Sequence, residues 1–328
     1  GSVLMTYNNK YNLSASIRRD GSSRFAPAGR WGTFWSVGGS WNVSDEDFLK
    51  DVKWLSSLKL RASYGLTGNN GVGNYIWRAT YAFGGNYVGE PASNPGNVGN
   101  PLLTWEKNKT LDIGMDLSLL DNRITIDAGY YNRHTYDLLL NEPISSTTGF
   151  TNFNNNIGSM RNRGLELAMN FIPIRSRDFQ WTVGFNIAFN KNKVLGLSSS
   201  GADIIDGQNI RRIGEDFQSV YTRLFIGADP ANGNPLWYTN ASRTSTTSNF
   251  AQAERVIIGT ASPKGFGGFN TTVKYKNFSI TTQFNFQYGN LVYDRWGFLY
   301  DSDGAFPNFN KNQKQLKRWQ RPGDVTTV

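Results

Sequence analysis

The stretch "TLDIGMDLSLLDNRITIDAGYY", residues 110–131, decides the fold class. Apolar and polar residues alternate along it on both sides of the Asp121-Asn122 pair. The apolar positions of the two halves are Leu111, Ile113, Met115, Leu117, Ile124 and Ile126. Period-two alternation across a tight turn predicts a β-hairpin with one apolar and one polar face. The apolar face then meets either a second sheet, as in a soluble sandwich, or lipid, as in a membrane barrel.

The same alternation recurs along most of the chain. It runs through residues 11–18, 31–41, 58–66, 165–171, 181–190 and 278–288. A soluble strand has about 5–6 residues, whereas a strand that crosses a bilayer needs roughly 9–11. These long runs favour an all-β antiparallel transmembrane barrel with short periplasmic turns and long extracellular loops. We expect this chain to contribute about ten strands to it, an even number.

The connections between these runs alternate in length. Short turns are expected at residues 8–10, 121–122, 176–178 and 276–277, and long stretches at residues 20–30, 68–105, 140–160 and 195–263. A membrane barrel separates its links in this way, with short turns at the periplasmic rim and long loops outside. The longest loop is expected to carry its own hairpin within residues 220–239. On the short side, Ser44 with Asp47 three residues later predicts a capped short helix.

Composition excludes several classes. The 328 residues are 38% hydrophobic, 14% aromatic and include 35 glycines. The mean hydropathy is −0.47, and no apolar run of about 18 residues exists, which excludes a membrane helix but not a membrane barrel. The absence of cysteine excludes disulfides and cysteine-ligated metals. The net charge of +9 comes from basic residues scattered along the sequence, without a nucleic-acid-binding motif, so no nucleic-acid partner is expected. Most of these charges indicate a solvated surface, and attraction to anionic lipid headgroups or to an acidic substrate is the other interpretation.

The polar faces indicate how wide the barrel is. They carry Asp, Asn, Gln, Thr and Gly, which suits a large polar lumen rather than a small barrel packed with its own side chains. About ten strands are too few to enclose such a lumen, so the chain is expected to be part of a larger wall. We predict that Asp112, Asp116, Thr125 and Asp127 face the lumen and that the apolar positions of the opening hairpin face lipid.

Several long blocks of the sequence resemble the barrel of SusC/RagA-type TonB-dependent outer-membrane transporters. They include "RRDGSSRF" at 18–25, "RWGTFWSVGGSWNVSDEDF" at 30–48, "LSSLKLRASYGLTGNNGVGNY" at 55–75, "TGFTNFNNNIGSMRNRGLELAMNF" at 148–171 and "RWQRPGDVT" at 318–326. The likeness follows essentially the whole chain in order. It implies that residues 1–328 are an interior segment of a single plugged barrel domain of about 22 strands, without the plug and the last strands.

The resemblance also implies a location and partners. The location is the cell outer membrane. The partners are a SusD-like surface lipoprotein, the TonB complex acting through the missing plug region, and outer-membrane lipid with lipopolysaccharide. The implied function is import of glycan fragments or peptides, so the substrate is an oligosaccharide or a peptide. The alternatives are a passive porin and a soluble glycan-binding β-sandwich.

No catalytic constellation is present, and we expect no enzyme, no metal site and no cofactor. His134 is the single histidine and has no second histidine with which to form a common zinc site. Aromatic rings stack on sugars and arginines bind carboxylates, so ligand contacts are expected on the long loops. The candidates are Trp77, Arg78, Tyr81, Arg211, Arg212, Trp237 and Tyr238. Such residues also pack loops against each other or against a partner protein.

Overall fold

The computed structural model describes residues 1–197, 201–302 and 304–328. They form two compact units. Unit 1 comprises Gly1–Ile204, Arg211–Phe217 and Pro263–Gly289, and unit 2 comprises Ile205–Ile210, Gln218–Ser262 and Asn290–Val328.

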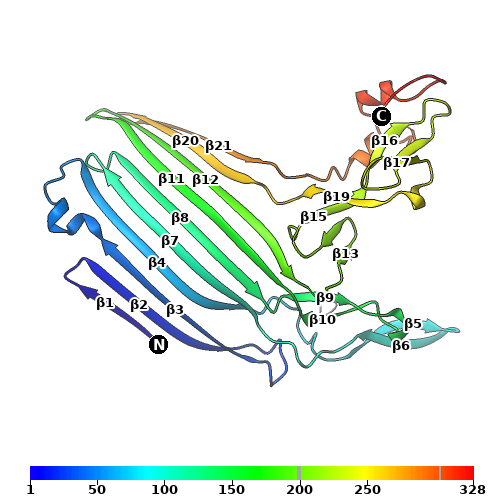
Figure 1. Ribbon diagram of the computed structural model, residues 1–328, viewed down its shortest axis with the longest axis horizontal. Coiled ribbons are helices and arrows are strands. Elements are labelled where there is room, and N and C mark those ends of the chain that lie inside the picture. The colour runs from blue at the N-terminus through cyan, green and yellow to red at the C-terminus, as the bar shows by residue number, and fades with distance from the viewer. Residues whose placement is uncertain (198–200, 303) are drawn as a thin grey trace. The chain divides into compact units, whose positions relative to one another are not determined.

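Unit 1 is built on one ten-stranded antiparallel sheet (Figure 1). Its strands, in their order across the sheet, are β1 (Ser2–Tyr7), β2 (Tyr11–Gly21), β3 (Trp31–Asn42), β4 (Leu55–Asn69), β7 (Glu106–Leu119), β8 (Ile124–Tyr136), β11 (Ser159–Arg175), β12 (Phe179–Gly196), β20 (Gly265–Tyr275) and β21 (Phe278–Tyr288). Sheet order follows chain order, so each strand pairs with the next long strand. The predicted all-β antiparallel wall of about ten strands is confirmed.

Short turns close one end of this sheet. In the β1–β2 turn, Asn8 and Asn9 have φ of 51° and 56°, and Leu120, Asp121 and Asn122 between β7 and β8 also have positive φ. Asparagine and aspartate tolerate this left-handed conformation better than other residues with a Cβ. The other end carries the long connections, which form small hairpins of their own: β5 (Thr80–Tyr87) with β6 (Glu90–Asn97), and β9 (Leu139–Pro143) with β10 (Asn152–Asn156).

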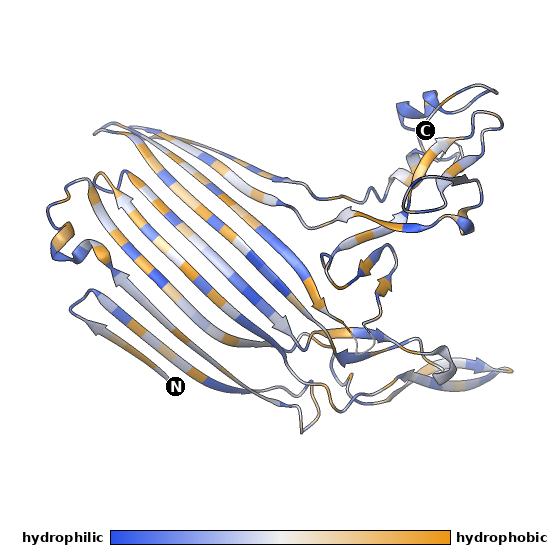
Figure 2. Ribbon diagram, viewed as in Figure 1, coloured by the Kyte–Doolittle hydropathy of each residue, from blue (hydrophilic) through white to orange (hydrophobic). Residues whose placement is uncertain are grey.

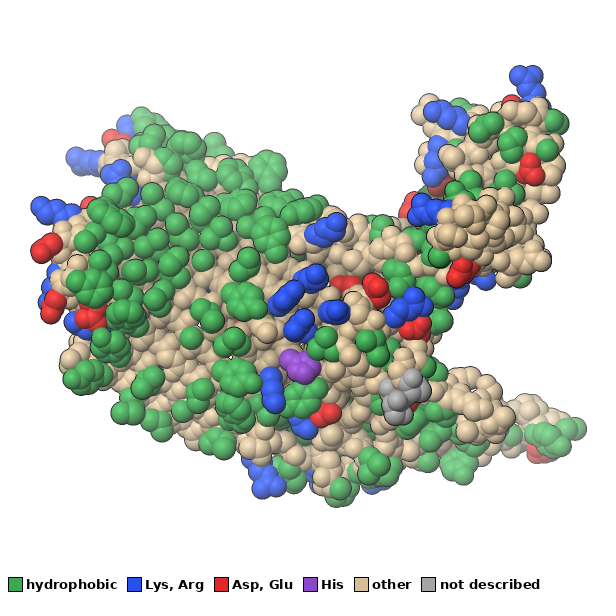
Figure 3. All heavy atoms as spheres, viewed as in Figure 1, with side chains coloured by type: hydrophobic (Ala, Val, Ile, Leu, Met, Phe, Trp, Pro, Cys, Tyr) green, Lys and Arg blue, Asp and Glu red, His purple; other side chains and the backbone are tan. Residues whose placement is uncertain are grey.

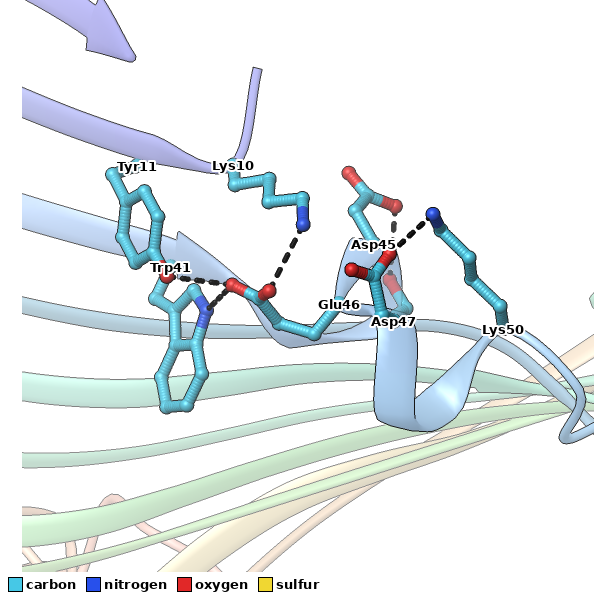
Figure 4. A network of polar contacts seen from close by, with 8 residues as sticks. Lys10, Tyr11, Trp41, Asp45, Glu46, Asp47 and Lys50 are labelled. Atoms are coloured by element: carbon cyan, nitrogen blue, oxygen red, sulfur yellow. Dashed lines mark hydrogen bonds and ion pairs between the residues drawn. The ribbon is translucent and has the colours of Figure 1, made fainter. Parts of the chain in front are cut away.

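The link between β3 and β4 differs from the predicted capped helix. It contains two 3-10 turns, η1 (Val43–Asp45) and η2 (Asp47–Leu49), with Ser44 inside the first and no side-chain cap on either. Glu46, between the turns, instead accepts hydrogen bonds from Tyr11 Oη (2.6 Å), Lys10 Nζ (2.9 Å) and Trp41 Nε1 (3.0 Å) (Figure 4). These donors, Tyr11 foremost, lower the pKa of the Glu46 carboxyl to about 2. The predicted capping box is therefore wrong: Ser44 lies within η1 and not before it, so its side chain is not at the N-cap position.

Hydrophobic and hydrophilic residues alternate along the strands of the sheet (Figure 2), and the strand register aligns them into two different faces. The polar face includes the row Lys59, Asp116, Asp127, Ala168, Asn186, Gly268 and Asn285. The apolar face includes the row Leu58, Leu117, Ile126, Met169, Phe185, Phe269 and Phe284. Large side chains of the apolar face stay open, with Leu165 58% and Phe284 60% exposed. A soluble sandwich would bury such residues against a second sheet, and no second sheet covers them in the described parts of unit 1.

Two small cores anchor the long connections of unit 1. The first contains Phe25, Phe34, Val72, Leu103 and Trp105. Its Phe34 side chain lies on the polar face of β3. The connections after β2 and β4 therefore pack onto the polar face, at the end of the sheet that carries the long connections. The second contains Val194, Leu197 and Ile204 at the end of β12.

The residues between β12 and β20 form two more sheets. One has the order β13 (Ile204–Asp206), β14 (Asn209–Arg211), β15 (Ser219–Arg223) and β19 (Arg255–Thr260). The other has the order β16 (Phe225–Ala228), β17 (Pro235–Tyr238) and β18 (Thr246–Thr247), and its β16–β17 pair is the hairpin expected within residues 220–239.

The helices are all short. They are η3 (Ser146–Thr148), η4 (Phe250–Gln252), α1 (Gly297–Tyr300) and η5 (Gln313–Lys317), in addition to η1 and η2. Within the described residues, none is long and apolar enough to cross a membrane.

Candidate functional site

The predicted lumenal residues lie together on the polar face of β7 and β8. Asp116 is directly opposite Asp127, an arrangement of like charges that destabilises a strand pair. Arg61 of β4 compensates: its Nη2 lies 2.8 Å from Asp127 Oδ1 and its Nε lies 3.5 Å from Asp116 Oδ1. Asp112 and Thr125 share this face, opposite Tyr131 and Ser118. The wall therefore presents a mixed-charge cluster with more acid than base.

Glycine makes the Arg61–Asp127 contact possible. Arg61 and Asp127 are on strands separated by β7, and the residue of β7 opposite Arg61 is Gly114. A Cβ on Gly114 would lie 2.6 Å from Arg61 Cζ. The guanidinium group thus lies flat across β7 because no side chain blocks it there.

The same arrangement recurs one strand further along. Tyr131 of β8 donates a hydrogen bond to Asn190 Oδ1 of β12 at 2.9 Å, across β11. It passes over Gly164, where a Cβ would lie 2.7 Å from the Tyr131 hydroxyl oxygen. Long side chains therefore lie against the wall and leave a hollow of about 540 Å³, lined by residues that include Arg61, Asp112, Tyr131 and Glu166. Its hydrogen-bonding groups and charges of both signs suit a polar, water-soluble ligand.

Of the three candidates of the first long connection, Trp77 is half-buried and the other two are exposed. Trp77 packs against the first core of unit 1, and Arg78 Cζ lies 4.6 Å from the centroid of the Trp77 ring. Tyr81, on β5, is 65% exposed. Arg78 is exposed as well, so Tyr81 and Arg78 are accessible to a ligand, whereas Trp77 is half-buried.

The candidates of the longest connection are divided between the two units. In unit 1, Arg212 binds Asp203 Oδ2 through Nε (3.0 Å) and Nη2 (2.7 Å), and Arg211 Cζ lies 4.8 Å from the Phe217 ring centroid. In unit 2, the Trp237 ring contacts those of Phe225 and Phe250, with centroid distances of 6.1 and 5.2 Å. Tyr238 is half-buried on β17, opposite Thr246. Packing within the loops is thus a role that Arg211, Arg212 and Trp237 already have.

Sequence reasoning missed two contacts that cross an intervening strand, Arg61 with Asp127 and Tyr131 with Asn190. The alternation does place Arg61 on a polar face, but Asp127 lies 66 positions away, and only the order of strands brings the two together. His134 lies 5.9 Å from Tyr136 between ring centroids. In the part of the chain that the structure describes, no group of three or more His, Cys, Asp or Glu side chains is placed to hold a metal ion.

Known proteins resemble this chain in sequence and in fold. Residues 1–215 match the family model described as "TonB dependent receptor-like, beta-barrel". TonB-dependent receptor P39 of Formosa agariphila is 32% identical over 98% of this chain and 35% of its own length. TonB-dependent receptor SusC of Bacteroides thetaiotaomicron is 32% identical over 87% of this chain and 30% of its own length.

Solved structures agree. The RagAB peptide transporter superposes with a TM-score of 0.86 at 27% identity, over 98% of this chain and 36% of that one. The RagAB peptide importer in its "closed-closed" state gives a TM-score of 0.87 at 27% identity, over 99% and 37%. This chain spans about a third of the length of these relatives. The chain therefore belongs to the TonB dependent receptor-like β-barrel family, and within it to the SusC/RagA type.

Proposed function

We propose that this chain forms wall and outer loops of an active importer in the bacterial outer membrane. The observation that carries the proposal is the ten-stranded sheet with an open apolar face and a charged, hydrogen-bonded polar face. A wall between lipid and an aqueous lumen requires this combination. A soluble glycan-binding sandwich has no use for an open apolar face, and membership of a TonB-dependent family argues against a passive porin.

In this proposal the polar face lines the lumen, the short turns face the periplasm and the long connections face outward. Asp112, Asp116, Thr125 and Asp127 are then exposed to the passing cargo, with Arg61 as their counter-charge. The two edge strands, β1 and β21, pair with further strands of a larger plugged barrel, because unpaired backbone groups are costly in hydrocarbon. We propose no catalytic, metal or cofactor chemistry for this wall.

The cargo in this proposal is a glycan fragment or a peptide, delivered by a SusD-like lipoprotein that sits over the connections at 68–105 and 195–263. Transport is driven by the TonB complex through a plug. Support comes from the names of similar proteins: SusC in one case and the RagAB peptide transporter in another. Tyr81 is the best-placed ligand contact among the loop candidates, because its ring is open while Trp77 and Trp237 are packed.

The assignment of one sheet face to lipid and the other to the lumen is tested by single cysteines at adjacent positions. The variants are Asp112→Cys and Ile113→Cys, in the full-length receptor reconstituted in vesicles. Each cysteine is labelled with a small fluorophore. We expect brominated lipid to quench the label at position 113 and aqueous iodide to quench the label at position 112. The reverse pattern, or equal quenching at both positions, would refute the assignment of the two faces to lipid and lumen.

The transport function is tested in cells that lack the receptor gene and are complemented with the full-length gene. Uptake of labelled oligosaccharides and of labelled peptides is measured with and without a proton uncoupler. Uptake of one class that needs both the receptor and the proton gradient supports the proposal. Receptor-dependent uptake that survives the uncoupler would identify a passive porin.

A further inference from the structure

Two neighbouring glycines leave part of the polar face without side chains. One row of paired residues crosses four strands in the order Arg61 (β4), Gly114 (β7), Gly129 (β8) and Glu166 (β11). Neighbouring strands lie about 4.8 Å apart, so the backbones of Arg61 and Glu166 are roughly 14 Å apart. We call the backbone of Gly114 and Gly129 between them the bare floor, which belongs to the hollow of about 540 Å³. The opposite face of the sheet, by contrast, is a broad surface of hydrophobic side chains (Figure 3).

The side chain of Arg61 lies flat at one edge of the bare floor. Asp127 and Asp116 hold it there, with Nη2 2.8 Å from Asp127 Oδ1 and Nε 3.5 Å from Asp116 Oδ1. A Cβ on Gly114 would lie 2.6 Å from Arg61 Cζ, 2.7 Å from Nε and 2.8 Å from Nη2. These three atoms are the nearest ones to that Cβ, and all belong to the movable end of a single side chain. A side chain at position 114 would therefore displace the guanidinium group and leave the backbone pairing of β7 in place.

The two glycines of the bare floor differ in what they contact. A Cβ on Gly129 would meet no atom within 4 Å, so Gly129 only leaves space, whereas Gly114 also allows a long side chain to lie down. Glycine in the interior of a strand weakens the strand and often marks a place where another group approaches the backbone closely. The guanidinium group of Arg61 is such a group at Gly114.

We propose that Gly114 determines how large a cargo the importer accepts, because it keeps Arg61 flat and the hollow open. The inference rests on the proposed function, in which the cargo moves along the polar face. Gly114 acts only through Arg61, so it is a positioning residue. A methyl group at position 114 would raise the guanidinium group from the floor into the hollow, where Asp112 and Glu166 are further carboxylates of the lining.

Raising Arg61 changes both the shape and the charge of the hollow, and two variants separate these effects. Arg61→Ala removes the counter-charge of Asp127 but leaves the bare floor open. Gly114→Ala keeps the arginine but moves it into the hollow. If shape is decisive, then only Gly114→Ala discriminates against large cargo, and adding Arg61→Ala to it removes the obstruction.

The test uses cells that lack the receptor gene and carry the full-length gene, either unmodified or with Gly114→Ala, Arg61→Ala or both substitutions. The matched control is Gly129→Ala, which adds the same methyl group to the same floor and displaces nothing. Gly164, which Tyr131 crosses in a similar way, is not substituted, because a Cβ there would also collide with the backbone oxygen of Phe189. The probes are labelled glucose oligomers and labelled uncharged peptides, each as a series of increasing length. The measured quantity is the ratio of long-probe to short-probe uptake, with the amount of inserted receptor checked by its heat-modifiable band.

Gly114→Ala is expected to lower this ratio by about fivefold or more, the lower end of the effect of forcing an extra group into filled space. Gly129→Ala, Arg61→Ala and the double variant are expected to keep the ratio of the unmodified receptor within about twofold. Equal ratios for Gly114→Ala and Gly129→Ala would overturn the proposal. So would a double variant that stays as low as Gly114→Ala, or an equal loss of short and long probes in Gly114→Ala.

Failure of this inference is distinguishable from failure of the proposed function. An unmodified receptor that inserts and takes up neither series in a proton-gradient-dependent way refutes the proposed function and this inference with it. An unmodified receptor that takes up one series, with a length dependence that Gly114→Ala does not change, refutes the role of Gly114 alone.

Discussion

Replacing Ala128 by arginine tests the assignment of the apolar face to lipid. Ala128 is four residues from Asn132, a polar residue towards the long-connection end of the strand, and five residues from Arg123 at the short turn. At about 3.3 Å per residue, these ends lie roughly 13 and 17 Å away along the strand. An arginine side chain is too short to bring its charge to either end, so the guanidinium group stays near the middle of the hydrocarbon layer. We expect a cost of about 2–4 kcal/mol, the range for arginine at the midplane of a membrane barrel.

The matched control is Gly129→Arg, one residue along the same strand and on the polar face. A Cβ at Gly129 meets no atom within 4 Å, and Glu166 lies directly opposite as a counter-charge. We expect a change within about 0.5 kcal/mol for this variant.

Both variants are measured in the full-length receptor by equilibrium urea unfolding from lipid vesicles, followed by tryptophan fluorescence. The difference of about 2–4 kcal/mol corresponds to roughly a 30- to 700-fold change in the unfolding equilibrium. Equal free energies of unfolding for the two variants, or a larger loss for Gly129→Arg, would refute the reasoning.

Three further predictions concern contacts within the sheet and its edges. Gly114→Ala should displace Arg61 from Asp127 and lower the free energy of unfolding by about 0.2–1 kcal/mol, a small amount because both side chains of the pair are more than a third exposed. In a receptor that already carries Asp127→Asn, the same substitution should have no cost. Additive costs of the two substitutions would contradict this prediction. The folded-state pKa of Glu46 is about 2, below the ordinary 4.5, so its contribution to stability is complete above pH 4.5 and is lost as the pH falls from there towards 2. Glu46→Gln should remove this part of the pH dependence of the urea midpoint, and an unchanged profile would show that the carboxylate is not stabilising. The 328-residue chain expressed alone should give no heat-modifiable band in detergent, because β1 and β21 leave unpaired edges in hydrocarbon at a cost of several kcal/mol per group; the appearance of such a band would disprove this expectation.

The sequence by itself determined the strands, their faces and their turns. The alternation from Leu111 to Ile126, broken by Asp121-Asn122, was enough to predict the β7–β8 hairpin and to place Asp116 and Asp127 on one face. This works because side-chain direction in a strand alternates with a period of two, a property that each strand carries locally. The cap predicted at Ser44 is absent because Ser44 lies inside a 3-10 turn, and Glu46 beside it binds Lys10, Tyr11 and Trp41, contacts that a local pattern does not contain.

Only the tertiary structure decided which residues become neighbours across strands. Lys109, His134, Arg161 and Lys193 look scattered along the sequence, yet strand order and register place them in one row. The contact of Arg61 with Asp127 likewise depends on the intervening Gly114, and the packing of Trp77 and Trp237 depends on loops that fold onto themselves. The physical reason is that pairing between strands is a long-range choice made by the whole sheet. The alternation in the sequence predicts the face on which a side chain lies, whereas the order and register of the strands determine its neighbours on that face.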